Sequence, residues 1–272
     1  MKSSRGSALE SERNMSEVYY LDSHCHLFSE EFQEDFDEVI ERSRKKGVVF
    51  LNIMCTEEEE AYRAMDFSET DRDHISVSYG IFPTDAEDAE KRWGELEKIA
   101  EDPRCTCISE IGLDYYWEKD PAMHDLQKEV FARQIELARK LNKPFCVHSR
   151  DAIQDTYDLM KAHHWKGLMH SFSGSAEMGR EFVKLGYYLS LGGPVTFKNA
   201  RHAANVAREM DVNFLLTETD SPYMAPVPVR GKRNEPSYIP HIVKKIAELR
   251  QMEEEILAAV LVENWRRFRS LQ

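Results

Sequence analysis

The sequence lacks any run of about 18 consecutive apolar residues, the length that a membrane-spanning helix needs. We therefore expect no contact with membranes. Residues 1–16 are rich in Ser, Glu and Arg and lack the apolar segment of a secretion signal. We interpret them as a disordered leader or extension, and residues 17–272 as the functional domain of a cytoplasmic protein.

Cysteine is scarce and odd in number, which argues against a disulfide framework. The five cysteines fall mostly in apolar, strand-like runs and are Cys25, Cys55, Cys105, Cys107 and Cys146. Free, buried thiols in a reducing compartment explain this pattern better than disulfides. A single residue separates Cys105 from Cys107, whereas a zinc knuckle places two residues between its cysteines.

Basic charge is also in deficit, with 36 Lys and Arg against 49 Asp and Glu and a net charge of −13. This balance excludes a protein that coats nucleic acid through a broad basic surface. It is compatible with a local phosphate site, because bound metal ions reverse the sign of charge inside a cleft. No heptad pattern or apolar surface stripe stands out, so a monomer is expected.

Short apolar runs without polar alternation, typical of strands covered on both faces, recur along the chain. They are Val18–Asp22, Val48–Ile53, Ile75–Gly80, Thr106–Glu110, Phe145–His148, Gly167–His170, Tyr187–Ser190 and Phe214–Glu218. Helical patterns lie at Glu31–Lys46, Glu57–Phe67, Ala86–Glu101, Ala122–Leu141, Ala152–His164, Ala176–Leu185, Lys198–Met210, Tyr238–Leu249 and Met252–Arg269. Strict alternation predicts a single-domain (β/α)8 TIM barrel, with a doubly wound open sheet as the alternative.

Five polar motifs sit where these strands are expected to end. They are Asp22–His26, Glu110–Asp114, His148–Arg150, His170–Gly174 and Glu218–Pro222. In a barrel the carboxyl ends of the strands converge on one face, so residues far apart in sequence meet there. Four histidines and at least two carboxylates are enough for two divalent metal ions.

The first motif predicts one metal ion. His24 and His26 are two residues apart, and the period of a strand turns both imidazoles to the same side. Asp220 ends the last strand and is expected to bind the same ion and to accept a proton from bound water. Asp22 is expected to support the histidine pair or to be a weak ligand.

A second ion is predicted from Glu110, whose two oxygens can bridge two metals, together with His148 and His170. Mixed imidazole and carboxylate ligands suit Zn or Mn better than Ca, and Mg remains open. Other histidines, in helical or loop contexts, are interpreted as ordinary surface or core residues; they are His74, His124, His163, His164, His202 and His241.

Two basic features accompany these motifs. Arg150 lies two residues past His148 and is expected to bind a phosphate oxygen, with an ion pair to Asp151 or Asp155 as the alternative. The segment 230–234, Arg-Gly-Lys-Arg-Asn, is the one clearly basic loop of an acidic protein. It is interpreted either as a guide for a phosphate backbone or as an ordinary solvated turn.

Taken in order, the five motifs resemble the TatD family of metal-dependent deoxyribonucleases, which belong to the amidohydrolase-type barrels. The similarity runs from about Tyr20 to Phe268 and includes Ala225–Pro236 and Asn264. It implies a 3′–5′ exonuclease-type phosphodiesterase acting on single-stranded DNA or strand ends, with two divalent ions (Mg, Mn or Zn). It also implies that the ligands are His24, His26, Glu110, His148, His170 and Asp220.

One stretch departs from the family pattern. Where TatD proteins usually read Gly-Val-His-Pro-His, residues 80–84 read Gly-Ile-Phe-Pro-Thr, so Phe82 and Thr84 replace both histidines. Two alternatives to a nuclease therefore stay open. One is a hydrolase of a small ester, lactone or amide on the same metals, and the other is a catalytically weak binding or scaffold protein.

Overall fold

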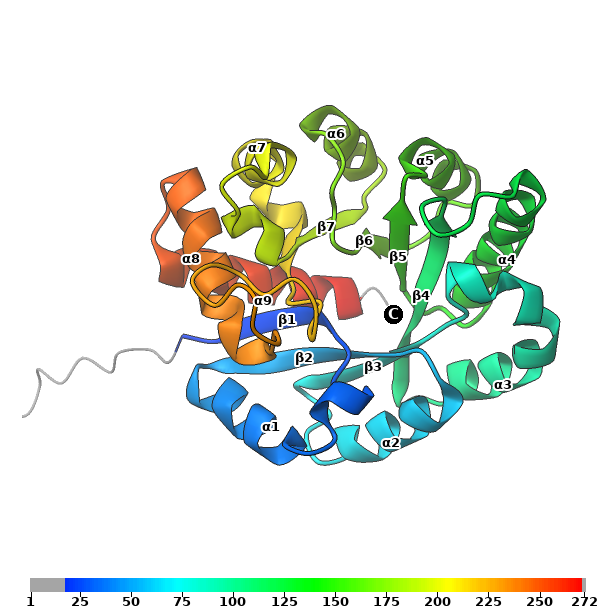
Figure 1. Cartoon of the computed structure of the whole chain (residues 1–272), viewed down its shortest axis with the longest axis horizontal. Coiled ribbons are helices and arrows are strands. Elements are labelled where there is room, and N and C mark those ends of the chain that lie inside the picture. The colour runs from blue at the N-terminus through cyan, green and yellow to red at the C-terminus, as the bar shows by residue number, and fades with distance from the viewer. Residues whose placement is uncertain (1–17, 271–272) are drawn as a thin grey trace, which may run out of the picture.

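Eight parallel strands form one barrel in the computed structural model, which describes residues 18–270 (Figure 1). Each strand pairs with the next along the chain. The strands are β1 (Tyr20–Cys25), β2 (Val48–Cys55), β3 (Ile75–Tyr79), β4 (Cys105–Asp114), β5 (Phe145–Arg150), β6 (Gly167–Met169), β7 (Tyr188–Leu191) and β8 (Leu215–Thr217). The predicted (β/α)8 TIM barrel is confirmed, and the open sheet is excluded.

Helices follow the strands and surround them (Figure 1). The α-helices are α1 (Phe36–Lys45), α2 (Glu58–Ser68), α3 (Ala89–Glu101), α4 (Pro121–Lys140), α5 (Ile153–Ala162), α6 (Ala176–Lys184), α7 (Arg201–Glu209), α8 (Ile239–Arg250) and α9 (Glu254–Ser270). Short 3-10 turns are η1 (Glu30–Phe32), η2 (Pro83–Asp88), η3 (Gly193–Thr196), η4 (Val212–Phe214) and η5 (Pro236–Tyr238). Between residues 18 and 270, no helix combines the length and apolar character needed to cross a membrane.

Three strands that carry site residues extend beyond their predicted ends. Strand β1 continues to Cys25 and β5 to Arg150, so His24 and His148 lie inside strands. Strand β4 continues to Asp114, so Glu110 lies inside a strand rather than at its end. Pairing with β5 shifts between Ile108 and Ile111 and then resumes, which extends the strand. The helix expected over 31–46 is divided into η1 and α1. The leader predicted at residues 1–16 lies outside the described residues.

The barrel closes between its first and last strands. The backbone N–H of Asp220 donates to the carbonyl of His24 at 2.9 Å, and that of His26 donates to the carbonyl of Ser221 at 2.9 Å. Nearer the start of these strands, the Thr217 hydroxyl donates to the carbonyl of Leu21 at 3.0 Å. The seam of the barrel therefore fixes the backbone of three predicted metal ligands directly.

Two hydrophobic layers hold the barrel together. One lies between the strands and the surrounding helices. All five cysteines, which divide between the two layers, are buried and free, as predicted. The other fills the barrel interior, where Leu21, Phe50 and Leu216 from three strands pack with Trp265 and Phe268 of α9. Side chains of α9 thus complete the interior core of the barrel.

Trp265 is the largest fully buried side chain of this inner layer, with 1% of its surface exposed. We expect Trp265→Ala to lower the free energy of unfolding by about 3–5 kcal/mol, because it removes a large apolar side chain and leaves a cavity. Trp265→Phe, which keeps an aromatic ring in the site, should cost clearly less. Urea denaturation of the two variants measures both values, and equal losses would contradict this account of the packing.

Candidate metal centre

The first cluster of metal-binding side chains joins β1 to the segment after β8. The Nε2 atoms of His24 and His26 lie 3.2 Å apart. Asp220 Oδ1 lies 3.8 Å from the Nε2 of His24 and 3.6 Å from that of His26. The three donors converge on one point at the carboxyl end of the barrel and form a group that can hold a metal ion.

The second cluster lies beside the first and comes from β4, β5 and the end of β6. Glu110 Oε1 lies 3.1 Å from His148 Nδ1 and 3.3 Å from His170 Nε2. These three residues form a second group that can hold an ion. The imidazole rings of His24 and His170 stack at 3.7 Å between centroids, so the two clusters are in direct contact.

Glu110 faces both clusters at once. Its second oxygen, Oε2, lies 3.4 Å from His24 Nε2 and 3.8 Å from His26 Nε2. Donors bound about 2.1 Å from one ion lie roughly 3.0–3.4 Å from each other, close to the spacings found here. Burial raises the pKa of Glu110, but the imidazoles of His170 and His24 outweigh it and hold the pKa well below its usual value. The donor set therefore fits divalent cations.

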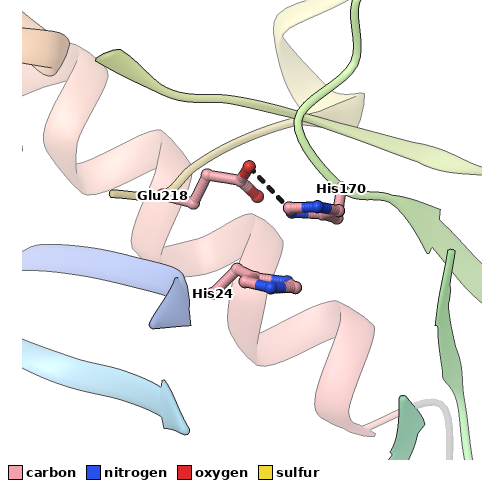
Figure 2. Close-up of side chains that lie close together, drawn as sticks. All are labelled: His24, His170 and Glu218. Carbon is pink, nitrogen blue, oxygen red and sulfur yellow. Dashed lines mark ion pairs between the residues drawn. The ribbon is translucent and has the colours of Figure 1, made fainter. Parts of the chain in front are cut away.

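Two further carboxylates stand behind the histidines of the second cluster. Asp114 Oδ2 lies 3.0 Å from His148 Nε2. Glu218 Oε1 lies 3.1 Å from His170 Nδ1 and accepts the backbone N–H of Ser171 at 2.7 Å (Figure 2). A carboxylate on the far nitrogen orients a ligand imidazole and raises its basicity. Both residues lie in the motifs quoted above, but their spacing alone assigned them no role.

Glu218 also has unused hydrogen-bonding capacity although it is buried. Its Oε2 atom has no hydrogen-bond partner among residues 18–270. Together with His24 and His170 it makes a third group that can hold a metal ion (Figure 2). Burial lowers the pKa of His170, but Glu218 and Glu110 raise it to about 10. The excess of carboxylate at this point favours a bound cation.

Asp22 supports the first cluster through the backbone. Its Oδ1 accepts the backbone N–H of His24 at 3.2 Å and that of Thr219 at 2.9 Å. Burial raises the pKa of Asp22 to about 7, against the opposing hydrogen bonds from Thr219. Behind His24, the Cys146 thiol lies 3.7 Å from Nδ1. Asp22 thus ties the end of β1 to the segment that carries Asp220.

A cavity of about 460 Å³ opens beside the second cluster and shares His148, His170 and Asp220 with the metal centre. Its wall carries the cationic residues Arg150 and Arg201, which come from β5 and the start of α7. His202, which is exposed as its helical context predicted, also lines the cavity. The sequence could not reveal this, because only the barrel brings α7 to the ends of β5 and β6.

Arg150 does not make the ion pair that was the alternative prediction. Its guanidinium lies 3.8 Å from the ring centroid of Tyr116. Asp155 instead accepts the hydroxyl of Tyr115 at 2.8 Å and lies 3.8 Å from Lys128 Nζ. Arg150 is therefore held at the cavity wall by an aromatic ring.

Known proteins similar to this chain share the whole of the barrel. Residues 21–270 match the family described as TatD related DNase. This chain belongs to the TatD family. The uncharacterized metal-dependent hydrolase YabD of Bacillus subtilis is 42% identical over 251 residues, which are 91% of this chain and 97% of YabD. YcfH of Escherichia coli, described in the same words, is 34% identical over 92% of this chain and 95% of its own length.

Solved structures of TatD proteins share the fold. The crystal structure of YjjV, a TatD homolog from Escherichia coli, superposes with a TM-score of 0.85 at 26% identity, over 92% of this chain and 98% of YjjV. A TatD family hydrolase from Entamoeba histolytica reaches 0.80 at 19% identity, over 93% of this chain and 99% of that chain. The predicted family is confirmed. The roles of the six ligand candidates stay predictions, and the structure brings all six together.

The departure from the usual TatD pattern lies against the metal centre. The ring of Phe82 packs on the imidazole of His148, with 4.9 Å between centroids. An apolar ring thus borders the second cluster on the β3 side, where a TatD protein usually has a histidine. The change alters the wall of the site and leaves the six candidate ligands intact.

Two residues of the basic loop of this TatD chain, Arg233 and Asn234, are used internally. Arg233 donates to both oxygens of Asp35, at 2.8 and 2.7 Å, and lies over the ring of Phe32 at 4.5 Å. Asn234 is buried and its amide donates to the carbonyls of Thr219 and Tyr223, at 2.8 and 2.7 Å. These two residues fasten the loop beside Asp220, whereas Arg230 and Lys232 are exposed, so the two interpretations of the loop stay predictions.

Removing the carboxylate behind His170 tests its positioning role. We expect Glu218→Gln to weaken the binding of Zn or Mn about 10–100-fold, because the ligand imidazole loses its oriented and polarised state. Isothermal titration of the metal-free protein measures the affinity. Asp155→Asn, which changes a carboxylate outside the metal centre, is the matched control. Equal affinity of Glu218→Gln and the wild type would contradict the assignment.

Acid should release the basic loop. Hydrogen bonds from Arg233, against the small effect of burial, hold the pKa of Asp35 at about 2, below its ordinary value of 3.8. A lowered carboxyl pKa stabilises the fold above the unfolded-state pKa, and this contribution is lost as the pH falls from about 4 to 2. We expect Asp35→Asn to cost about 1 kcal/mol at pH 7. This loss of stability should disappear near pH 2. Urea denaturation at both pH values measures it. A loss that persists in acid would contradict the pairing of Asp35 with Arg233.

Proposed function

We propose that this chain is a metal-dependent hydrolase that shortens DNA from strand ends by cleaving phosphodiester bonds, as a 3′–5′ exonuclease. The observation that carries the proposal is the position of Glu110. Its two oxygens face two separate pairs of imidazoles, beside a cavity whose wall carries two arginines. Metal ions about 3.5–4 Å apart are the arrangement that nucleases and phosphatases use on phosphate esters.

The comparisons support this proposal at two levels. The two bacterial relatives described above carry names that stop at metal-dependent hydrolase. The family description adds deoxyribonuclease activity. The cavity supports the phosphate substrate independently, because Arg150 and Arg201 offer positive charge inside a protein of net charge −13. Guanidinium groups bind phosphate oxygens in a fixed, bidentate geometry.

The ligands are assigned by cluster. His24, His26 and Asp220 would hold one divalent ion, and His148 and His170 the other, with Glu110 between them. The ions, Mg, Mn or Zn, would lower the pKa of a bound water and offset charge that develops on the phosphate. The mixed nitrogen and oxygen donors are compatible with each of these metals.

The protein side chains supply the rest of the chemistry. Asp220 is an ionised carboxylate: burial raises its pKa, but His26 and the other imidazoles outweigh that and lower it. It is placed to accept the proton of the attacking water. Arg150, at the cavity wall, orients the scissile phosphate. Asp22 keeps the backbone under His24 in register with the segment that carries Asp220.

A second candidate function has one observation in its favour. Phe82 places an apolar ring against His148, on a side of the site where the usual TatD histidine would offer a polar group. A small ester, lactone or amide would suit such a wall, since ligand sites are mostly apolar with a few polar groups that set orientation. The same metal centre would activate water for attack on a carbonyl carbon.

End-labelled single-stranded DNA decides between the two functions. We expect stepwise shortening by the wild type with added Mg or Mn, and at least a hundredfold loss of rate in Glu110→Ala, because both ions lose a shared ligand. Glu58→Ala, a carboxylate paired with Tyr79 and Arg92 outside the metal centre, should keep the rate. Intact DNA together with hydrolysis of a carbonyl ester by the folded, metal-loaded wild type would favour the second function.

A further inference from the structure

Exposed large hydrophobic side chains gather on two loops at the carboxyl face of the barrel. Among residues 18–270, seven such side chains are exposed, and five of them follow β4 or β8. These five are Tyr116, Trp117, Tyr223, Met224 and Val227. Strands β4 and β8 are four places apart in an eight-stranded barrel, so the two loops stand on opposite sides of the metal centre.

The loop after β4 presents an aromatic pair with a cation. The rings of Tyr116 and Trp117 meet edge to face, with 4.8 Å between centroids and an interplanar angle of 85°. The Arg150 guanidinium lies over both, 3.8 Å from the Tyr116 centroid and 5.5 Å from that of Trp117. Trp117 nevertheless remains 68% exposed. Arg150 covers one face of Tyr116, whereas most of the Trp117 side chain is available to a ligand.

The pair is tied to the metal centre by one carboxylate. Asp114 Oδ1 accepts the backbone N–H groups of Tyr116 and Trp117, each at 2.9 Å, and Oδ2 lies 3.0 Å from His148 Nε2. Asp114 is 1% exposed, and Gln127 accepts its backbone N–H at 2.9 Å. The position of the aromatic rings is thus set by the same group that orients a predicted metal ligand.

We propose that Trp117 and Tyr116, with Arg150, form a stacking platform for the nucleobase next to the scissile phosphodiester. This inference rests on the proposed action on DNA. Every base has a π face, so stacking on aromatic rings binds single strands with little sequence preference, and a nearby arginine adds contact with the phosphate. Tyr223 and Met224 are exposed on the loop after β8, across the metal centre from this platform.

The platform is tested with single-stranded DNA whose 3′-terminal nucleotide is normal or abasic. We expect Trp117→Ala to raise KM about tenfold with little change in kcat, because the stack binds the ground state and the transition state equally. The wild type should prefer the normal substrate, and Trp117→Ala should treat both alike. Trp117→Phe should restore most of the preference. Tyr19→Ala, at an exposed tyrosine preceding β1, is the matched control and should behave as the wild type.

Binding without turnover gives a second readout. Titration of the metal-free wild type with oligothymidylate should quench tryptophan fluorescence, and the quenching should disappear in Trp117→Phe. Trp117 is the most exposed of the four tryptophans, so its loss identifies the source of the signal.

The outcomes separate this inference from the proposed function. DNA shortening with unchanged KM and unchanged abasic preference in Trp117→Ala overturns the platform and leaves the nuclease standing. Quenching without hydrolysis supports the platform and removes the nuclease. Absence of both overturns both. A dimer of the wild type that Trp117→Ala dissolves, with no change in DNA binding, would show that the pair contacts a second copy of this chain, and would overturn the platform as well.

Discussion

The structure depends on one buried carboxylate shared between two pairs of imidazoles. Glu110 brings an oxygen to each pair, and its neighbours hold it ionised in spite of its burial. Burial lowers the pKa values of His26, His148 and His170, but neighbouring carboxylates outweigh this effect, raise all three and so favour a proton on each ring. Bound divalent ions would take the place of those protons, which couples metal binding to proton release. The rest of the fold keeps these five side chains at a fixed spacing.

Three further carboxylates connect the histidines of the metal centre to the backbone of the loops around it. Asp22 joins the ends of the first and last strands, and Glu218 connects His170 to the backbone after β6. Asp114 joins His148 to the aromatic turn after β4. In each case one oxygen faces the metal centre or its backbone and the group also accepts a main-chain N–H. The loops proposed to bind the substrate are therefore positioned by the groups that orient the predicted ligands.

The net charge of the chain does not describe the charge around its metal centre. The chain is acidic as a whole, yet Arg150 and Arg201 line the cavity next to the metal centre. The one basic segment visible in the sequence uses Arg233 to hold its own loop against Asp35. A phosphate substrate would thus meet positive charge that comes from β5 and α7, far from that segment along the chain. Net charge governs solubility and encounter, whereas the local field governs recognition.

The sequence by itself determined the barrel and the six ligand candidates, because strand burial and polar strand ends leave a pattern that can be read locally. It misplaced the ends of β1, β4 and β5, and left Glu218 and Asp114 without roles. Only the tertiary structure decided that Arg233 is used internally and that Tyr116 lies under Arg150. Local periodicity records which face of an element is buried. Contacts between residues far apart along the chain depend on how the closed barrel sets its strands and loops side by side.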